Sequence, residues 1–215
     1  EINALAVYNT GKRTFGAAAG AVPERKNSGV ALKAEAKARI GAAKAGIMAL
    51  YASGDKNFSD STKGKSTAFI TPASIAGTTG YWGYTGKLNI QGPTDTGMDT
   101  DYLNIDGGGA SNTNLGLGIT TVQANVSFPV VEKEIDGYAA LGWYTHNSAA
   151  SGFKKYIGTD LYAQGTYHFG SGLNWELGAD YAMLGKGHAG SVALGQSNQS
   201  TRNVAAVFSR LQLEF

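Results

Sequence analysis

The chain of 215 residues contains no cysteine and only 4 prolines. Without cysteine, thiol catalysis, disulfide cross-links and thiolate zinc sites are all excluded. The few prolines, set against 31 glycines, give a composition unlike that of a disordered or collagenous chain. The length suits one folded unit, and we expect a single domain over residues 1–215.

Charge is also scarce, because Asp, Glu, Lys and Arg make up 16% of the residues, whereas soluble domains carry roughly 25%. The formal net charge is +2 and no basic stripe is interleaved with aromatic residues, which excludes a nucleic-acid-binding surface. No segment approaches the roughly 20 consecutive apolar residues of a membrane-spanning helix, so a helical membrane protein is excluded as well. Tyrosine is frequent, with 11 residues beside 3 Trp, as expected of a surface that meets lipid and its interfaces.

Apolar and polar residues alternate with a period of two in several segments, which predicts β-strands with one apolar face. In the clearest segment the apolar face carries Leu173, Trp175, Leu177, Ala179, Tyr181 and Met183, and the other face carries Asn174, Glu176, Gly178, Asp180 and Ala182. In the preceding segment the apolar face carries Ile157, Leu161, Ala163, Tyr167 and Phe169, and the other face carries Tyr156, Asp160, Tyr162, Gln164, Thr166 and His168. Residues 170–172, Gly-Ser-Gly, predict a tight hairpin between the two.

Segment 29–40 is the most polar of these and admits two interpretations. Its Ala, Lys, Glu and Arg residues are good helix formers, but a helix would spread the charges around its circumference. A strand instead places Lys33, Glu35, Lys37 and Arg39 on one face. We therefore predict a strand here.

The alternating segments predict about eight strands, whose connections fall into two classes. The segments are 1–10, 29–40, 44–53, 119–130, 138–144, 156–169, 173–183 and 202–215. Short turns at 41–43, 132–137 and 170–172 alternate with longer Gly-, Ser-, Asn- and Thr-rich connections at 16–28, 54–113, 146–155 and 185–201. Short periplasmic turns and long outer loops are typical of outer-membrane barrels. The pattern predicts an all-β, transmembrane, antiparallel up-and-down β-barrel with both termini in the periplasm.

Aromatic residues mark both ends of the predicted strands. Phe128, Phe169, Trp175 and Phe215 fall near the short turns, and Tyr51, Trp143 and Tyr181 fall near the long loops. Two such girdles are expected at the two membrane interfaces. The alternative is a soluble eight-stranded barrel of the lipocalin kind, which would turn its apolar residues inward.

The last strand, from Val204 to Phe215, has apolar residues at alternate positions and ends on a phenylalanine. It resembles the C-terminal strand of bacterial porins and other outer-membrane proteins, although Ser209 occupies a position that is usually apolar. The resemblance implies that Leu211, Leu213 and Phe215 are read by the barrel assembly machinery. Residues 44–55 with the long loop that follows are similar to the C-terminal part of larger porin-type barrels. The chain is therefore expected to be either a complete small barrel or one section of a wider one.

Candidate chemistry is sparse. His146 and His188 have no metal-ligand partner at a suitable spacing, and His168 shares a face with Asp160 and Thr166. A Ser/His/acid set is one interpretation of His168, but no motif marks a nucleophile, so we favour a hydrogen-bonding role over catalysis. The loop over 95–106 gathers Asp95, Asp99, Asp101 and Asp106, whose oxygens could hold calcium or could simply be solvated.

The sequence thus predicts a porin-like outer-membrane channel for small polar solutes, in contact with membrane lipid and lipopolysaccharide. The expected pore-lining residues are Lys33, Glu35, Lys37, Arg39, Asp160, Gln164, His168, Glu176, Asp180, Arg210, Gln212 and Glu214. The alternative is a closed barrel with a packed polar lumen that serves as an anchor or adhesion platform, and an outer-membrane enzyme ranks third. About eight strands leave room only for side chains, so a pore requires further strands from a longer chain or from a homo-oligomer.

Overall fold

The computed structural model describes residues 1–14, 24–57, 60, 62–69, 116–149, 154–170, 172–187 and 203–213. These residues form one β-sheet, and no helix occurs among them. In these ranges there is thus no helix long and apolar enough to cross a membrane.

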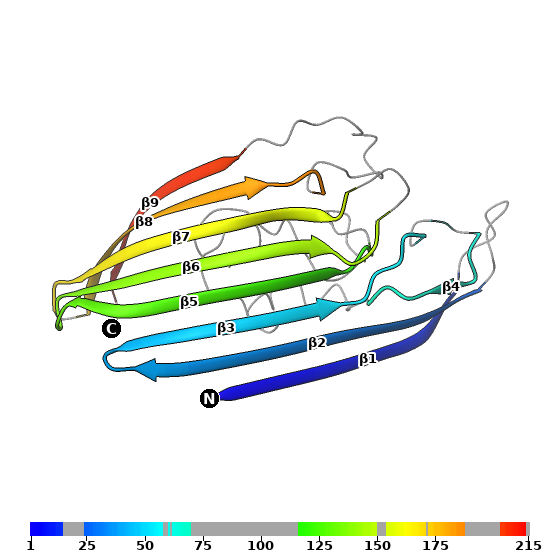
Figure 1. The fold of residues 1–215 in the computed structure, drawn as a ribbon, viewed down its shortest axis with the longest axis horizontal. Coiled ribbons are helices and arrows are strands. Elements are labelled where there is room, and N and C mark those ends of the chain that lie inside the picture. Colours follow the sequence, from blue (N-terminus) through cyan, green and yellow to red (C-terminus); the bar gives the residue numbers. More distant parts are fainter. Residues whose placement is uncertain are drawn as a thin grey trace.

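The sheet is built from eight long strands that follow one another in chain order, with the two-residue β4 paired in parallel with β2 (Figure 1). The strands are β1 (Ile2–Thr14), β2 (Glu24–Ile40), β3 (Ala43–Ala52), β4 (Lys65–Ser66), β5 (Ile119–Val131), β6 (Ile135–His146), β7 (Tyr156–His168), β8 (Leu173–Leu184) and β9 (Val204–Leu213). Neighbours are antiparallel in the order β1-β2-β3-β5-β6-β7-β8-β9. The prediction of an all-β, up-and-down, antiparallel architecture is therefore confirmed.

The two outer strands leave the sheet open. Within the described residues, β1 pairs only with β2, and β9 pairs only with β8. The sheet curves along its width, and the end of β9 lies behind the middle strands in Figure 1. The predicted closure into a barrel is not present among these residues.

Segment 29–40 is part of strand β2, as the single-sided charge pattern indicated. The strand begins earlier than predicted, because Glu24 to Ser28 pair with Thr14 to Thr10 of β1. The predicted loop over 16–28 is therefore too long. Arg25, Asn27 and Gly29 continue the alternation of the charged segment, so the same period of two extends the strand backwards.

The two faces of the sheet differ in chemistry. We call apolar face the side that exposes large apolar side chains such as Leu32, Ile47, Val122, Leu141, Leu161, Leu177, Val207 and Leu211. The other side, which carries Lys33, Glu35, Asp160 and Glu176, is called the polar face. No Asp, Glu, Lys or Arg residue takes an apolar-face position over 2–8, 30–40, 43–51, 120–128, 135–143, 161–167, 173–183 and 205–213. The strand period alone produces this separation.

Aromatic side chains lie near both ends of the apolar face. Phe128, Phe169 and Trp175 are exposed near the short turns, and Tyr51, Trp143 and Tyr181 are exposed near the long connections. The positions of these six residues agree with the sequence prediction, while Phe215 lies outside the described residues. Aliphatic side chains fill the band between the two aromatic rows.

Strand β7 departs from the predicted alternation at its first residues. Tyr156 is exposed, whereas Ile157 is fully buried, so the two positions are exchanged relative to the prediction. The cause is a β-bulge: Tyr144 pairs with Gly158 and Thr145 pairs with Tyr156, so Ile157 has no partner across the ladder. A bulge shifts the side-chain register by one residue, and a strict period of two does not anticipate it.

The polar face carries a buried apolar cluster at its loop end. Ala31, Leu50, Ala52, Ile119 and Tyr144 belong to it, together with Phe69 from the long connection after β3. A Cβ atom at Gly29 would lie 2.5 Å from the Phe69 Cα, so the connection crosses directly over β2 at this glycine. The length of segment 54–113 and its apolar residues predict a long ordered loop that is either extracellular or folded into the pore. Its described residues do contact the sheet, with β4 beside Lys26 and Asn27, and residues 70–113 lie outside the described part.

Gly118 is the residue at which the long connection re-enters the sheet, and its backbone requires glycine. Its φ is +67°, and a Cβ atom there would lie 2.3 Å from the Ala52 carbonyl oxygen. We expect Gly118→Ala to lower the free energy of unfolding by about 1–3 kcal/mol, measured by urea denaturation. Gly165→Ala is the matched control, because nothing lies within 4 Å of the added carbon. Equal loss in both variants would contradict this account of Gly118.

Candidate functional site

A row of charged side chains follows strand β2 along the polar face. The Glu35 carboxylate lies between two lysines, with Lys33 Nζ 3.2 Å from Oε2 and Lys37 Nζ 2.6 Å from Oε1. Lys33 and Glu35 are largely covered, whereas 54% of the Lys37 side chain is exposed. The three residues share one face because they are two positions apart, as the sequence predicted. One carboxylate therefore forms ion pairs with two lysines, and the three side chains together keep a net positive charge.

A group of acidic residues lies on the polar face of strands β7 and β8. We call this part of the polar face the acidic side, and the part near β2 and β3 the basic side. Asp160, Glu176 and Asp180 are buried, with 0%, 7% and 5% of their surfaces exposed. Glu176 lies directly opposite Arg210 of β9, and Arg210 Nε donates a 2.7 Å hydrogen bond to Glu176 Oε2. The sequence predicted these polar-face positions correctly, but it did not predict the pairing of Glu176 with Arg210.

The lysines of β2 have their acidic partner on their own strand. The packed-barrel alternative predicts that Lys33, Lys37 and Arg39 pair with nearby acids such as Asp160, Glu176, Asp180 and Glu214, because unpaired charges in a dry interior cost several kcal/mol each. The observed partner of both lysines is Glu35 of their own strand, and strands β3, β5 and β6 lie between β2 and β7 in the sheet order. Lys33 and Lys37 are therefore paired within one strand, and Glu176 is paired with Arg210 across one ladder.

Aromatic and amide side chains pack between the acidic residues. The Tyr162 ring stacks on Phe208 at a centroid distance of 5.8 Å and meets Tyr138 edge-on at 5.8 Å. Tyr162 donates a 2.6 Å hydrogen bond to Gln164 Oε1, and Gln164 Nε2 donates one of 2.9 Å to Thr166. The predicted lining residue Gln164 is thus part of a chain of hydrogen bonds along β7.

His168 joins strands near the short turns. Its Nε2 lies 3.0 Å from Asp136 Oδ2 on β6, and its Nδ1 lies 2.7 Å from Asn174 Oδ1 on β8. These contacts are those of a hydrogen-bonded bridge between neighbouring strands, the role that we favoured over catalysis. His146 is buried at the other end, with Nδ1 3.3 Å from the Gly118 carbonyl oxygen, and His188 lies outside the described residues.

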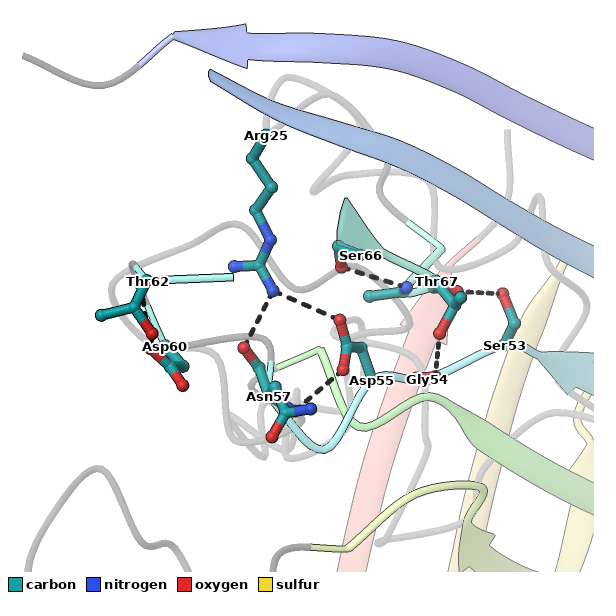
Figure 2. A network of polar contacts seen from close by, with 10 residues as sticks. Arg25, Ser53, Gly54, Asp55, Asn57, Asp60, Thr62, Ser66 and Thr67 are labelled. Carbon is teal, nitrogen blue, oxygen red and sulfur yellow. Dashed lines mark hydrogen bonds and ion pairs between the residues drawn. The ribbon is translucent and has the colours of Figure 1, made fainter. Parts of the chain in front are cut away.

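The start of the long connection after β3 is held by a buried ion pair that the sequence analysis missed (Figure 2). Arg25 Nη2 lies 3.2 Å from Asp55 Oδ2 and donates a 2.8 Å hydrogen bond to the Asn57 carbonyl oxygen. Only 5% of the Arg25 side chain and 11% of the Asp55 side chain are exposed. The alternation of residues in β2 could have placed Arg25 on the polar face, because Arg25 and Lys33 are an even number of positions apart. The pair was not predicted because residues 16–28 were expected to form a loop.

Further hydrogen bonds hold the same segment, both to strand β2 and within the segment itself. Ser53 Oγ accepts from the Val30 amide at 2.8 Å and donates to the Thr67 carbonyl oxygen at 2.7 Å. The Thr62 hydroxyl donates a 2.6 Å hydrogen bond to Asp60, and this bond, aided by the Thr62 amide, lowers the pKa of Asp60. These contacts give the first part of segment 54–113 a defined path along the sheet (Figure 2).

Ser209, the polar exception in the apolar pattern of the last strand, has a hydrogen-bonding partner on the same face. Ser209 lies on the apolar face, where its Oγ accepts a 2.8 Å hydrogen bond from the Trp175 indole N–H. An indole donor in apolar surroundings needs such an acceptor. Leu211 and Leu213 are exposed on this face, and Gln212 is half-buried on the polar face. Glu214, Phe215 and the predicted calcium-binding loop over 95–106 lie outside the described residues.

Comparison with known proteins adds no family. No protein-family model matches the sequence, and no curated protein matches it. The function is therefore inferred from the chain's own side chains.

The Arg25–Asp55 pair yields a stability prediction. Arg25→Gln should lower the free energy of unfolding by about 3–5 kcal/mol, because it leaves the Asp55 charge buried without its cation. It should also speed tryptic cleavage after Lys63 and Lys65, followed by mass spectrometry.

The control is Lys12→Gln on the neighbouring strand. Lys12 pairs with Glu24 at 3.1 Å, but 62% of its side chain is exposed, so about 0–1 kcal/mol should be lost. If both variants behaved alike, the buried pair would not be what holds the connection.

Proposed function

We propose that this chain forms part of the wall of a porin-like channel in a bacterial outer membrane, through which small polar solutes diffuse. The observation that carries the proposal is the apolar face, which crosses all the long strands, has no Asp, Glu, Lys or Arg side chain over the ranges given above, and has aromatic residues near both ends. An aliphatic band between two aromatic girdles is the surface that a transmembrane β-sheet presents to lipid.

A soluble barrel would place these residues differently. It would bury the apolar face and turn Glu176 and Asp160 to water, whereas here 50% of Leu177 and 65% of Leu211 are exposed and both acids are buried. Soluble monomers rarely expose a contiguous apolar patch beyond a few hundred square ångströms. The polarity of the two faces therefore favours lipid over water as the neighbour of the apolar face.

The lipid environment also demands partners for the outer strands. Unpaired backbone N–H and C=O groups cost several kcal/mol each in hydrocarbon, so open sheet edges do not occur there. We propose that β1 and β9 pair with each other or with additional strands, from a longer chain or from a second copy. In either case the short turns face the periplasm, the long connections face lipopolysaccharide, and the last strand is the part read by the barrel assembly machinery.

A channel and a sealed barrel differ in what fills the polar face. The Tyr138, Tyr162 and Phe208 rings over the acidic side favour a packed interior, which is the second candidate. On the basic side, Lys37, Arg39 and Lys44 are exposed and line a cavity of about 470 Å³. This solvated basic side favours the channel, because a sealed interior would leave those charges without water.

The assignment of the faces can be tested with paired arginine substitutions. Leu177→Arg places a charge on the apolar face and should lower folding stability in lipid vesicles by about 2–4 kcal/mol. Thr166→Arg places the same charge on the polar face opposite Glu176 and should be tolerated. Gly178 is unsuitable as the control, because a Cβ there would lie 2.4 Å from the Phe208 ring. Equal tolerance of both arginines would reject the assignment of the apolar face to lipid.

Planar-bilayer recordings on the full-length protein test the channel itself. We expect steady conductance whose anion preference falls when Lys33, Lys37 and Arg39 are replaced by Gln, because these side chains give the lumen a local positive field. A bilayer that stays sealed, combined with a loss of stability in the same variants, would instead support the packed barrel.

A further inference from the structure

A group of basic side chains lies on the polar face beside the short turn between β2 and β3. Arg39 and Lys44 are register partners across this turn, and Lys37 is the next residue of β2 on the same face. All three are exposed and line the cavity of about 470 Å³ together with Asn125 and Ser127 of β5. Lys37 and Arg39 are among the pore-lining residues predicted from the sequence, and Lys44 is not, although the short hairpin brings it opposite Arg39.

Within the described part of the chain, the positive charge at this place is balanced only in part, because Lys37 pairs with Glu35 and Glu1 lines the same cavity. Neither Arg39 nor Lys44 takes part in an ion pair or a side-chain hydrogen bond there. The one acidic residue lining the cavity, Glu1, accepts a 2.8 Å hydrogen bond from Asn3 through its carboxylate. Like charges directly opposite each other destabilise an antiparallel pair, so the Arg39–Lys44 pairing carries a cost that a bound anion would remove.

The glycine opposite Lys37 lets the Asn125 amide lie close to the basic group. Lys37 pairs with Gly46, and Gly46 pairs with Asn125, so no side chain stands between the lysine and the asparagine. A Cβ atom at Gly46 would lie 3.1 Å from Asn125 Oδ1, which places the amide group directly above the glycine. The cavity volume is within the range of roughly 300–1,000 Å³ that is usual for small-molecule sites.

We propose that Lys37, Arg39, Lys44 and Asn125 form a binding site for the phosphate group of a small solute. This inference deepens the proposed function, and it rests on that function for the route by which a solute reaches the site. A guanidinium group binds phosphate oxygens in a bidentate manner, and each ammonium group adds a point charge. The Asn125 amide and the Ser127 hydroxyl can donate to further oxygens. A doubly charged phosphate matches two cations without a partner better than a singly charged carboxylate does.

Inorganic pyrophosphate is the probe, titrated calorimetrically into the full-length protein in uncharged detergent. We expect Arg39→Gln and Lys44→Gln each to weaken binding roughly tenfold, which corresponds to the loss of one charged hydrogen bond. Lys12→Gln removes the same charge at the opposite end of the sheet and should change the affinity less than about twofold, since its field is screened over that distance. Because Lys44→Gln relieves repulsion, its unfolding midpoint in urea should not fall.

Several outcomes would overturn the site. These are absence of pyrophosphate binding, an equal loss of affinity in Lys12→Gln, and a Lys44→Gln protein that loses affinity only because it unfolds. Binding to phosphatidylglycerol vesicles that requires Arg39, without binding of pyrophosphate, would assign a lipid headgroup in place of a solute. The proposed function fails separately: a protein that binds pyrophosphate but does not conduct keeps the site and loses the channel, and one that conducts without binding does the reverse.

Discussion

The period of two along each strand is the constraint on which the rest of this structure depends. Successive side chains of a strand point to opposite faces. Over the strand ranges that have no charge on the apolar face, this alternation places every charged residue on the polar face. A slip of one residue in any ladder would carry Lys33, Glu176 or Asp180 to the apolar face. The hydrogen-bonded register between neighbouring strands therefore fixes both the apolar surface and the composition of the polar face.

On the polar face, the charged residues pair with partners that are close to them in the sheet. The lysines of β2 meet Glu35 within their own strand, and Glu176 meets Arg210 across one ladder, so each pair is satisfied locally. The rings of Tyr138, Tyr162 and Phe208 pack on the acidic side, while Lys37, Arg39 and Lys44 on the basic side are exposed. This asymmetry leads to the proposals of a solvated passage and of an anion site on the basic side. A uniformly packed face would support neither.

The connection after β3 shows how an extended loop gains order from a few contacts. Gly29 lets the chain pass close to β2, Arg25 holds Asp55 in a buried pair, and Ser53 links β2 to Thr67. All of these contacts lie at the end of the sheet that is near the long connections. The described part of the connection therefore lies against the polar face and covers part of it at this end.

The sequence by itself determined the strands, their up-and-down order and the division into two faces, since all of these follow from local alternation and from the lengths of the connections. It placed Lys33, Lys37, Asp160 and Glu176 on the polar face, because the alternation of apolar and polar residues within each strand is enough to assign its side chains to a face. Only the tertiary structure decided which charges pair, where Ile157 bulges and why Ser209 interrupts the apolar pattern. These features depend on the register between strands and on contacts between segments far apart in the chain, and a single strand's pattern contains neither.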